Sequence, residues 1–175
     1  MNEKNTSLKT RKLVFISVLV AQAMILSFIE RMIPVPFIAP GAKLGLANII
    51  TVTAVYMLTF KEAAAVVLLR IILTATTFGS LSSFLYSLSG GVLSLLVMAS
   101  IVKVFRDEVS LVGVSISGAI AHNIGQLIVA AFVINSFLII TYLPILLIIA
   151  IPTGIFVGFV ARFLINYLNR INFRK

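Results

Sequence analysis

Cysteine does not occur in this chain, which excludes disulfide bonds and thiolate metal sites. Histidine occurs once, as His122, and the five acidic residues include a single aspartate, Asp107. One histidine cannot form a metal cluster, and no Ser-His-acid arrangement is evident because the acids border the apolar runs. We therefore predict that the protein is not an enzyme and holds no metal or cofactor.

A nucleotide-binding loop is also missing. The pattern G-x-x-x-x-G-K-[ST] does not occur, and the stretch APGAKLG lacks its spacing. If the chain serves an active transporter, another subunit must supply ATP hydrolysis.

Charged residues are scarce and hydrophobic residues are abundant. The chain is 11% charged and 61% hydrophobic, against about 25% and about 45–50% in soluble domains, and its mean hydropathy is +1.17. Too few polar residues remain to cover a soluble surface. We therefore predict an integral membrane protein built of helices, because lipid offers no partner to unpaired backbone groups.

Six apolar segments approach the roughly 20 residues that a helix needs to cross a bilayer. The long uncharged stretch 109–161 is divided at 135–144, where Asn, Ser, Thr and Pro gather. We expect a single transmembrane domain over residues 1–175, an all-α bundle of six spanning helices. These helices are predicted at about 13–29, 44–60, 63–78, 84–102, 109–134 and 144–165.

The distribution of Lys and Arg predicts the orientation of this bundle. With the amino terminus inside, eleven of the 14 basic residues fall in inner segments, Arg31 and Lys43 fall outside, and Arg70 lies within a span. Because basic residues favour the cytoplasmic side, we expect a multi-pass protein of the bacterial cell membrane with both termini in the cytoplasm. This grouping explains the net charge of +9 without nucleic acid, which needs a continuous basic face.

One alternative concerns the first apolar segment. Ala21-Gln22-Ala23 fits a signal-peptide cleavage site, and cleavage there would leave five helices. The apolar run continues past that site to Ile29, which favours a membrane helix.

Arg70 is the most conspicuous polar residue within a span. It follows Lys61 by nine residues, about 13 Å along a helix, and so lies near the middle of the bilayer, where Arg costs about 2.5–3.5 kcal/mol. No acid shares its span, and Glu30 is the one acid on the outer side, a candidate partner of Arg70 or of Arg31. Arg70 either anchors a bound anion or is buried against backbone carbonyls.

A second polar group lies in the fifth predicted helix. His122 and Gln126 are four residues apart and share a helix face, and Asn123 flanks them. Ser115 and Ala119 extend the same stripe. Three polar side chains within five residues favour a cavity, although a single interhelical histidine is the simpler explanation.

The loop between the first two predicted helices is stiff and basic. Pro34, Pro36 and Pro40 fix its backbone, and Arg31 and Lys43 bracket it. We interpret this loop as an outer cover over a site for an anionic substrate; the alternative is a connector with interfacial charges. The predicted substrate-binding residues are Glu30, Arg31, Lys43, Asn48, Arg70, His122, Asn123 and Gln126.

Small residues four apart mark helix faces that allow close packing. Ser17 and Ala21 form such a face on the first predicted helix, and Gly154 and Gly158 form one on the sixth. These faces seat neighbouring helices or a separate membrane partner.

Three longer motifs resemble the Gx transporter family, whose members are often labelled heptaprenyl diphosphate synthase component I. They are ERMIPVPFIAPGAKLGLANIITV, FLYSLSGGVLSLLVM and AHNIGQLIVAAF, and the similarity spans residues 22–158. The family is similar in plan to the S components of energy-coupling factor transporters, which have six helices and bind a vitamin or cofactor precursor. The resemblance implies a transmembrane T subunit and two cytoplasmic ATPases as partners, with Ser17 and Ala21 facing the T subunit.

The synthase label can be tested against the sequence. Chain-elongating prenyl diphosphate synthases hold Mg²⁺ and diphosphate with two aspartate-rich motifs, whereas this chain has only Asp107. It cannot carry out that catalysis alone. Three functions stay open: a substrate-binding subunit for a small vitamin, cofactor or isoprenoid-related molecule, a non-catalytic membrane partner of a prenyl diphosphate synthase, and a structural membrane protein.

A cysteine introduced as Ile38→Cys tests the predicted orientation, because the natural chain has no thiol. We expect an impermeant thiol reagent to label this variant in intact cells, since the basic residues place the loop outside. A control variant in a predicted inner loop, Glu108→Cys, should react only after lysis. Labelling of Ile38→Cys only after lysis would overturn the topology.

Overall fold

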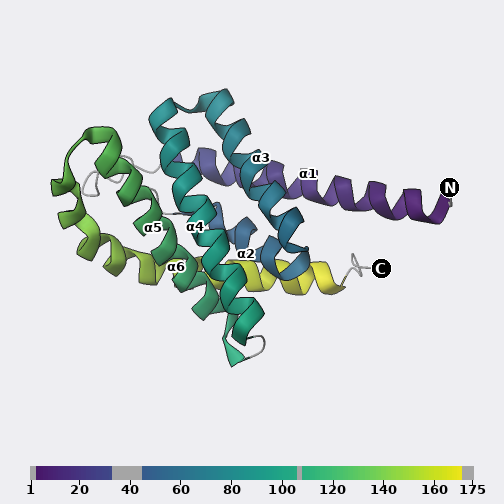
Figure 1. Ribbon diagram of the computed structural model, residues 1–175. Helices are drawn as coiled ribbons and strands as arrows, with labels where there is room; N and C mark the ends of the chain where they lie inside the picture. The colour runs from purple at the N-terminus through teal and green to yellow at the C-terminus, as the bar shows by residue number, and fades with distance from the viewer. Residues whose placement is uncertain (1–2, 33–44, 106–107, 171–175) are drawn as a thin grey trace.

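The computed structural model describes residues 3–32, 45–105 and 108–170, and all regular structure in these ranges is helical (Figure 1). The predicted all-α class is therefore confirmed, and the elements whose bounds the structure gives are six α-helices and the short 3₁₀ helix η2. The elements are α1 (Glu3–Met32), α2 (Asn48–Met57), α3 (Phe60–Phe78), α4 (Leu81–Phe105), α5 (Leu111–Ile134), η2 (Phe137–Tyr142) and α6 (Leu143–Arg170).

The second helix is shorter than the predicted range 44–60. It has 10 residues, about 15 Å of helix against roughly 30 Å of hydrocarbon. It ends because Leu58 is extended, and α3 begins at once behind Thr59, whose backbone N–H donates to the Glu62 carboxylate at 2.9 Å. The hydropathy pattern hides this break, because Leu58 and Phe60 on either side of Thr59 are apolar.

Four helical segments are long and apolar enough to cross a membrane, so the chain has the composition of a multi-pass membrane protein. They are Lys9–Met32, Leu81–Phe105, Leu111–Ile134 and Phe137–Arg170. The helix α3 is long enough but carries Lys61, Glu62 and Arg70 within its 19 residues. Six crossings and cytoplasmic termini therefore remain predictions.

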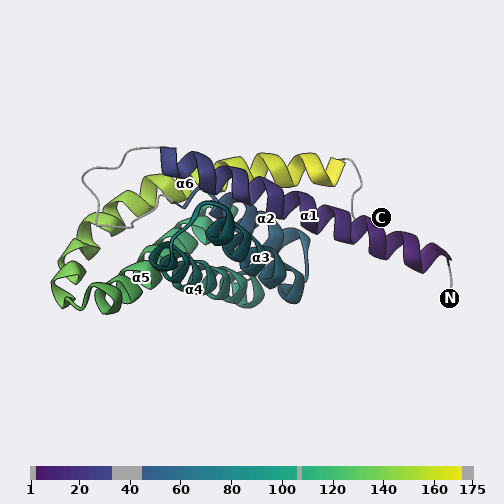
Figure 2. The same cartoon turned by 90° about the horizontal axis from the view of Figure 1, so that it is seen from above.

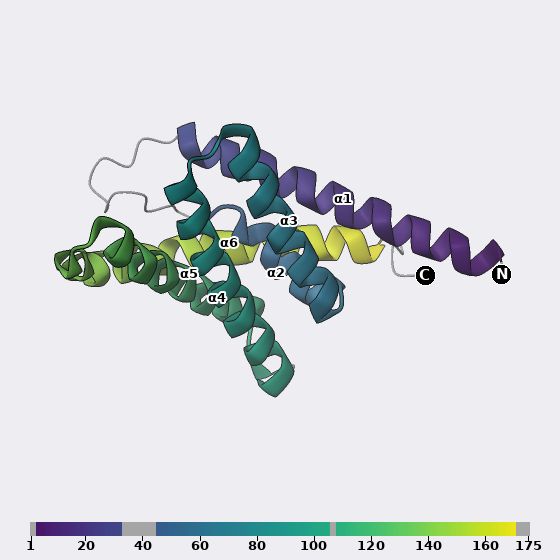
Figure 3. The same ribbon diagram turned by 45° about the horizontal axis from the view of Figure 1, so that its top comes forward.

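The helix α5 lies at the centre of the bundle. It packs between α4 and α6 and carries twelve buried residues, more than α2, α3, α4 or α6. The helix α1 contacts α2 and α3, and its amino-terminal half extends past the other helices (Figures 1 and 2). The amino-terminal end of α1 and the carboxyl-terminal end of α6 point the same way (Figure 3).

The two small-residue faces predicted from the sequence have different surroundings. Gly154 and Gly158 of α6 are buried against α5, where an added Cβ would lie 2.6 Å from Ile116 Cα and 2.9 Å from Val112 Cα. This face therefore seats a neighbouring helix of the same chain. Ser17 and Ala21 are exposed on α1.

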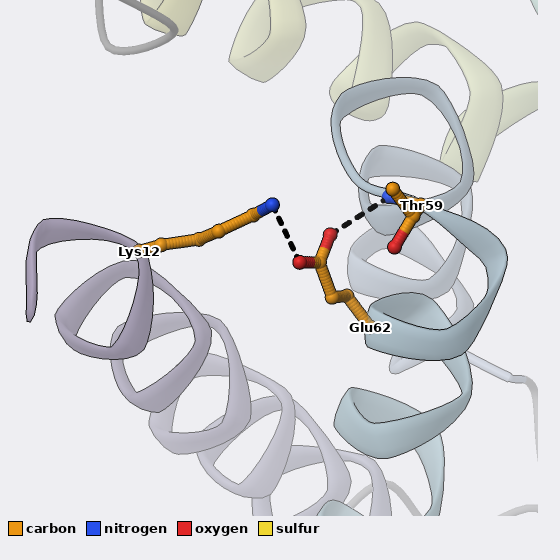
Figure 4. Close-up of polar contacts among 3 residues, drawn as sticks. All are labelled: Lys12, Thr59 and Glu62. Atoms are coloured by element: carbon orange, nitrogen blue, oxygen red, sulfur yellow. Dashed lines mark hydrogen bonds and ion pairs between the residues drawn. The ribbon is translucent and has the colours of Figure 1, made fainter. Parts of the chain in front are cut away.

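A carboxylate at the start of α3 connects that helix to α1 (Figure 4). Glu62 accepts from the Thr59 amide and pairs with Lys12 of α1, with Nζ and Oε1 2.5 Å apart. Burial raises the pKa of Glu62, but the hydrogen bonds from Lys12 and Thr59 lower it more, so its pKa lies below the ordinary value. The charged carboxylate therefore stabilises the fold.

Substitution of Glu62 should lower stability in a pH-dependent way. At pH 7 we expect Glu62→Ala to cost about 1 kcal/mol for the lost cap and ~0.2–1 kcal/mol for the lost ion pair, whereas Lys12→Ala loses only the pair. Because the folded-state pKa lies below the unfolded value of about 4.3, this stabilisation is present above that value and is lost as the pH falls through the folded-state pKa.

Thermal unfolding in detergent at a series of pH values measures the effect. The difference between the natural chain and Glu62→Gln should shrink as the pH falls below 4. A difference that stays constant or grows in acid would contradict the role given to this carboxylate.

Candidate functional site

A small polar cavity lies where six parts of the chain meet, beside the carboxyl-terminal end of α1. Its volume is about 20 Å³, which accommodates about one water molecule. Its lining residues come from α1, the turn before α2, α2, α3, α4 and α5. They are Ser27, Glu30, Gly45, Ala47, Asn48, Arg70, Ile71, Thr74, Ser87 and His122.

Arg70 is the buried cation of this cavity. Its residue is 5% exposed, and Nε and Nη2 have no hydrogen-bond partner within the described residues. The guanidinium packs against α4 at Gly91, where an added Cβ would lie 3.4 Å from Nη2. A buried charged group whose donors lack hydrogen bonds carries a large desolvation cost. A polar group that bonds to Nε and Nη2 of Arg70 would reduce this cost.

Glu30 supplies the negative charge that is absent from the Arg70 span. It is 6% exposed, lines the same cavity and attracts the Arg70 guanidinium electrostatically. Its Oε1 also accepts from the backbone N–H of Gly45. Of the two partners that the sequence left open, Arg70 shares this cavity with Glu30, whereas Arg31 does not line it.

Arg31 has different partners at the edge of the bundle. Its guanidinium donates to the carbonyl of Phe78 and, at 2.9 Å, to Ser83, and it lies 5.1 Å from the centre of the Phe78 ring. Arg31 therefore fastens α1 to the carboxyl-terminal end of α3 and does not line the cavity. Lys43, the other predicted basic residue, lies outside the described residues.

Asn48 of α2 and His122 of α5 line the same cavity as Arg70. Asn48 is 2% exposed, and neither of its side-chain polar atoms has a partner among the residues that the structure describes. Gly45 has φ of +82° and brings the two residues together, since an added Cβ would lie 3.0 Å from Asn48 Nδ2 and 3.8 Å from His122 Cδ2. The polar wall of the cavity thus joins an amide, an imidazole and a guanidinium.

The other two predicted residues of α5 lie outside the cavity wall. Gln126 is buried against Gly90 of α4, where an added Cβ would lie 2.8 Å from Gln126 Cγ. Asn123 points to α6 and donates to the carbonyl of Leu146 at 3.1 Å. The polar residues predicted to share one site on α5 are therefore divided. His122 lines the cavity, and Asn123 connects α5 to α6.

The region that resembles a known family contains this whole cavity. Residues 19–164 match the family model described as heptaprenyl diphosphate synthase component I. The chain belongs to this family. No curated protein and no solved structure was found to match the chain.

The heptaprenyl diphosphate synthase component I match includes every cavity residue, from Ser27 to His122. It ends before Arg170 and begins after Ser17, so only one residue of the exposed Ser17–Ala21 pair is matched. The cavity is therefore part of the family's own region of the chain.

Several cavity residues were missed by the sequence analysis. Thr74 lies one turn beyond Arg70 and Ser87 faces it from α4. Serine and threonine are common in membrane helices and often bond to their own backbone, as Ser87 does to the carbonyl of Ser83. The adjacent pair Gly90-Gly91, which admits side chains of α5 and α3, was the signal that could have found this wall.

The chemistry of this cavity suits an oxyanion or a polar hydrogen-bonding group. Arg70 and Asn48 offer buried donors that have no partner in the described ranges, and a guanidinium binds carboxylate and phosphate well. No group of three or more metal-binding side chains occurs among the described residues.

A methyl group at Gly90 should disturb the site through packing alone. In Gly90→Ala the new Cβ would meet the His122 carbonyl at 2.8 Å and His122 Cε1 at 3.0 Å, so we expect unfolding to become easier by about 1–3 kcal/mol. The matched control is Gly113→Ala, whose Cβ would approach only side-chain atoms at 3.2 and 3.4 Å. Thermal unfolding in detergent compares the two, and equal melting temperatures would contradict the close approach of α4 and α5.

Proposed function

We propose that the protein is a substrate-binding membrane subunit, similar to an S component, of an ATP-driven importer. Its ligand would be a small anionic vitamin, cofactor precursor or isoprenoid-related molecule. The observation that carries this proposal is the buried Arg70 guanidinium. It shares a polar cavity with Asn48 and His122, and two of its nitrogens have no partner among the residues described.

The energetic cost of this arrangement supports a binding role. Buried ion pairs are often no more stabilising than apolar residues of similar volume, and an intramembrane charge is a functional-site hypothesis by default. Glu30 neutralises Arg70 in part, yet Nε and Nη2 of Arg70 and both polar atoms of Asn48 still lack partners in the described chain. A ligand oxygen would satisfy these groups.

The size of the cavity implies that the helices separate when a ligand binds. A volume of about 20 Å³ is far below the ~300–1,000 Å³ of small-molecule sites. By backbone proximity, α1 packs against α2 and α3 among the helices described, and Arg31 adds a hydrogen bond to Ser83 of α4, so α1 can move with the least loss of packing. An entering carboxylate or phosphate would then take the place of Glu30 beside Arg70.

The proposed partners follow from the resemblance to S components. A T subunit and two cytoplasmic ATPases would complete the importer, and the exposed Ser17–Ala21 face of α1 would contact the T subunit. In this proposal all six helices form one domain in the bacterial cell membrane, with both termini in the cytoplasm.

The family description favours a second candidate, a non-catalytic membrane partner of a prenyl diphosphate synthase. A synthase component that contains the aspartate-rich motifs would then supply catalysis. Affinity purification from membranes separates the two candidates: ATPases and a T subunit should co-purify under the first, and a synthase component under the second. A purified chain with no protein partner and no small ligand would instead indicate a structural role.

Removing both buried charges together should abolish ligand binding and preserve the fold. Arg70→Ala alone would leave the buried Glu30 carboxylate without the Arg70 charge, at a cost of about 3–5 kcal/mol, so the informative variant is Glu30→Gln with Arg70→Gln. We expect this variant to keep its melting temperature within a few degrees and to lose at least about tenfold in ligand occupancy, since hydrogen bonds to charged groups contribute ~1.5–3 kcal/mol.

Native mass spectrometry of the detergent-purified chain measures the occupancy by co-purifying anionic molecules. Arg162→Gln, which changes an exposed basic residue of α6, is the matched control and should keep the ligand. Equal ligand occupancy in the double variant and the control would contradict the proposed site.

A further inference from the structure

A second and much larger cavity lies between α2, α3 and α4, away from Arg70. Its volume is about 520 Å³, within the range of small-molecule sites. The residues that line it are Val55, Phe60, Ala63, Leu96, Ala99, Ser100, Val102 and Lys103. Ala63 and Arg70 are seven residues apart on α3, about 10 Å of helix, so the two cavities are separate features.

One stripe of α4 forms most of this groove. Leu96, Ala99, Ser100 and Lys103 recur at helical spacing on a single face. Phe60 and Leu96 are 52% and 45% exposed, so the groove is open at its side and not enclosed in the core. The short side chains of Ala99 and Ser100 leave the space that gives the groove its volume.

The groove has a basic end and an apolar body. Lys103 lies in the last turn of α4 and is exposed, and no ion pair with a described residue is formed. Glu62, in the first turn of the neighbouring α3, is already bound to Lys12 and the Thr59 amide. The ammonium group of Lys103 is therefore available to a negative group that enters with an apolar chain.

We propose that this groove binds an acidic phospholipid of the surrounding bilayer, with one acyl chain in the apolar body and the phosphate at Lys103. The apolar body by itself cannot select a lipid, because it offers a chain little that the bilayer does not. Selection comes from charge, and basic pockets between membrane helices are sites for anionic head groups. The lipid site is distinct from the proposed substrate site at Arg70.

The test uses the full chain in nanodiscs of equal parts phosphatidylglycerol and phosphatidylcholine, followed by native mass spectrometry of retained lipids. We expect the natural chain to retain phosphatidylglycerol about fivefold over phosphatidylcholine, the ratio that corresponds to ~1 kcal/mol for one lysine near an anionic surface. Lys103→Gln should retain both equally, and Lys103→Arg should keep the preference.

Two further variants make the test specific. Ala99→Leu places a larger side chain in the groove and should reduce the retention of both lipids, whereas Arg162→Gln removes a distant exposed charge and should change nothing. Melting temperatures identify any variant that fails to fold, and Lys103→Gln, at an exposed position, tests the proposal even if Ala99→Leu unfolds.

Two results would overturn the lipid site. One is an unchanged preference for phosphatidylglycerol in Lys103→Gln. The other is displacement of phosphatidylglycerol by equimolar farnesyl diphosphate, which would show that a prenyl diphosphate is the occupant instead. Either result leaves the Arg70 proposal untouched, because that proposal is measured by the Glu30 and Arg70 variants.

Discussion

The attraction between Glu30 of α1 and Arg70 of α3 is the interaction on which the proposed site depends. In lipid, apolar side chains gain little by contacting one another instead of acyl chains, so polar contacts decide where a membrane helix packs. Without Glu30, the Arg70 guanidinium would be a lone buried charge. With it, the charge is compensated in part, while Nε and Nη2 of Arg70 have no hydrogen-bond partner in the described part of the chain.

The glycines of α4 and of the turn before α2 make this arrangement sterically possible. The Arg70 guanidinium packs against Gly91. The side chains of His122 and Gln126 pack against the neighbouring Gly90. Gly45 combines a positive φ with an amide that donates to Glu30. Three charged or polar groups from three helices thus meet because the positions facing them have no side chain.

Much of this site could be predicted from the sequence, and the failures have physical causes. Polar residues within apolar runs must face other helices, which identified Arg70, Asn48 and His122 as buried. Asn123 was predicted to share a site with His122, but neighbouring residues on a helix point about 100° apart. The Asn123 amide reaches α6 instead. Periodicity assigns a face to a residue but does not say which neighbouring helix lies there.

The sequence predicted the positions of the helices better than their lengths. The end of α2 depends on one extended residue, Leu58, and on a cap that begins α3, and neither changes the hydropathy. Similarly, the polar stretch 135–144 was read as a loop, but it contains the 3₁₀ helix Phe137–Tyr142 after Asn135 in the left-handed conformation. Breaks of this kind are set by local hydrogen bonds, which composition does not record.

The contacts of α1 suggest how a site so small could admit a ligand. Lys12 pairs with Glu62 near the start of α3, and Glu30, 18 residues later and about 27 Å away along the helix, faces Arg70. In the proposed function, an anion that replaces Glu30 would weaken the second contact, and the hydrogen bonds of Arg31 to Phe78 and Ser83 would have to break before this end of α1 moves. The Lys12–Glu62 pair shares no residue with the cavity, so it would persist as a pivot while the carboxyl-terminal end of α1 moves away and the cavity widens.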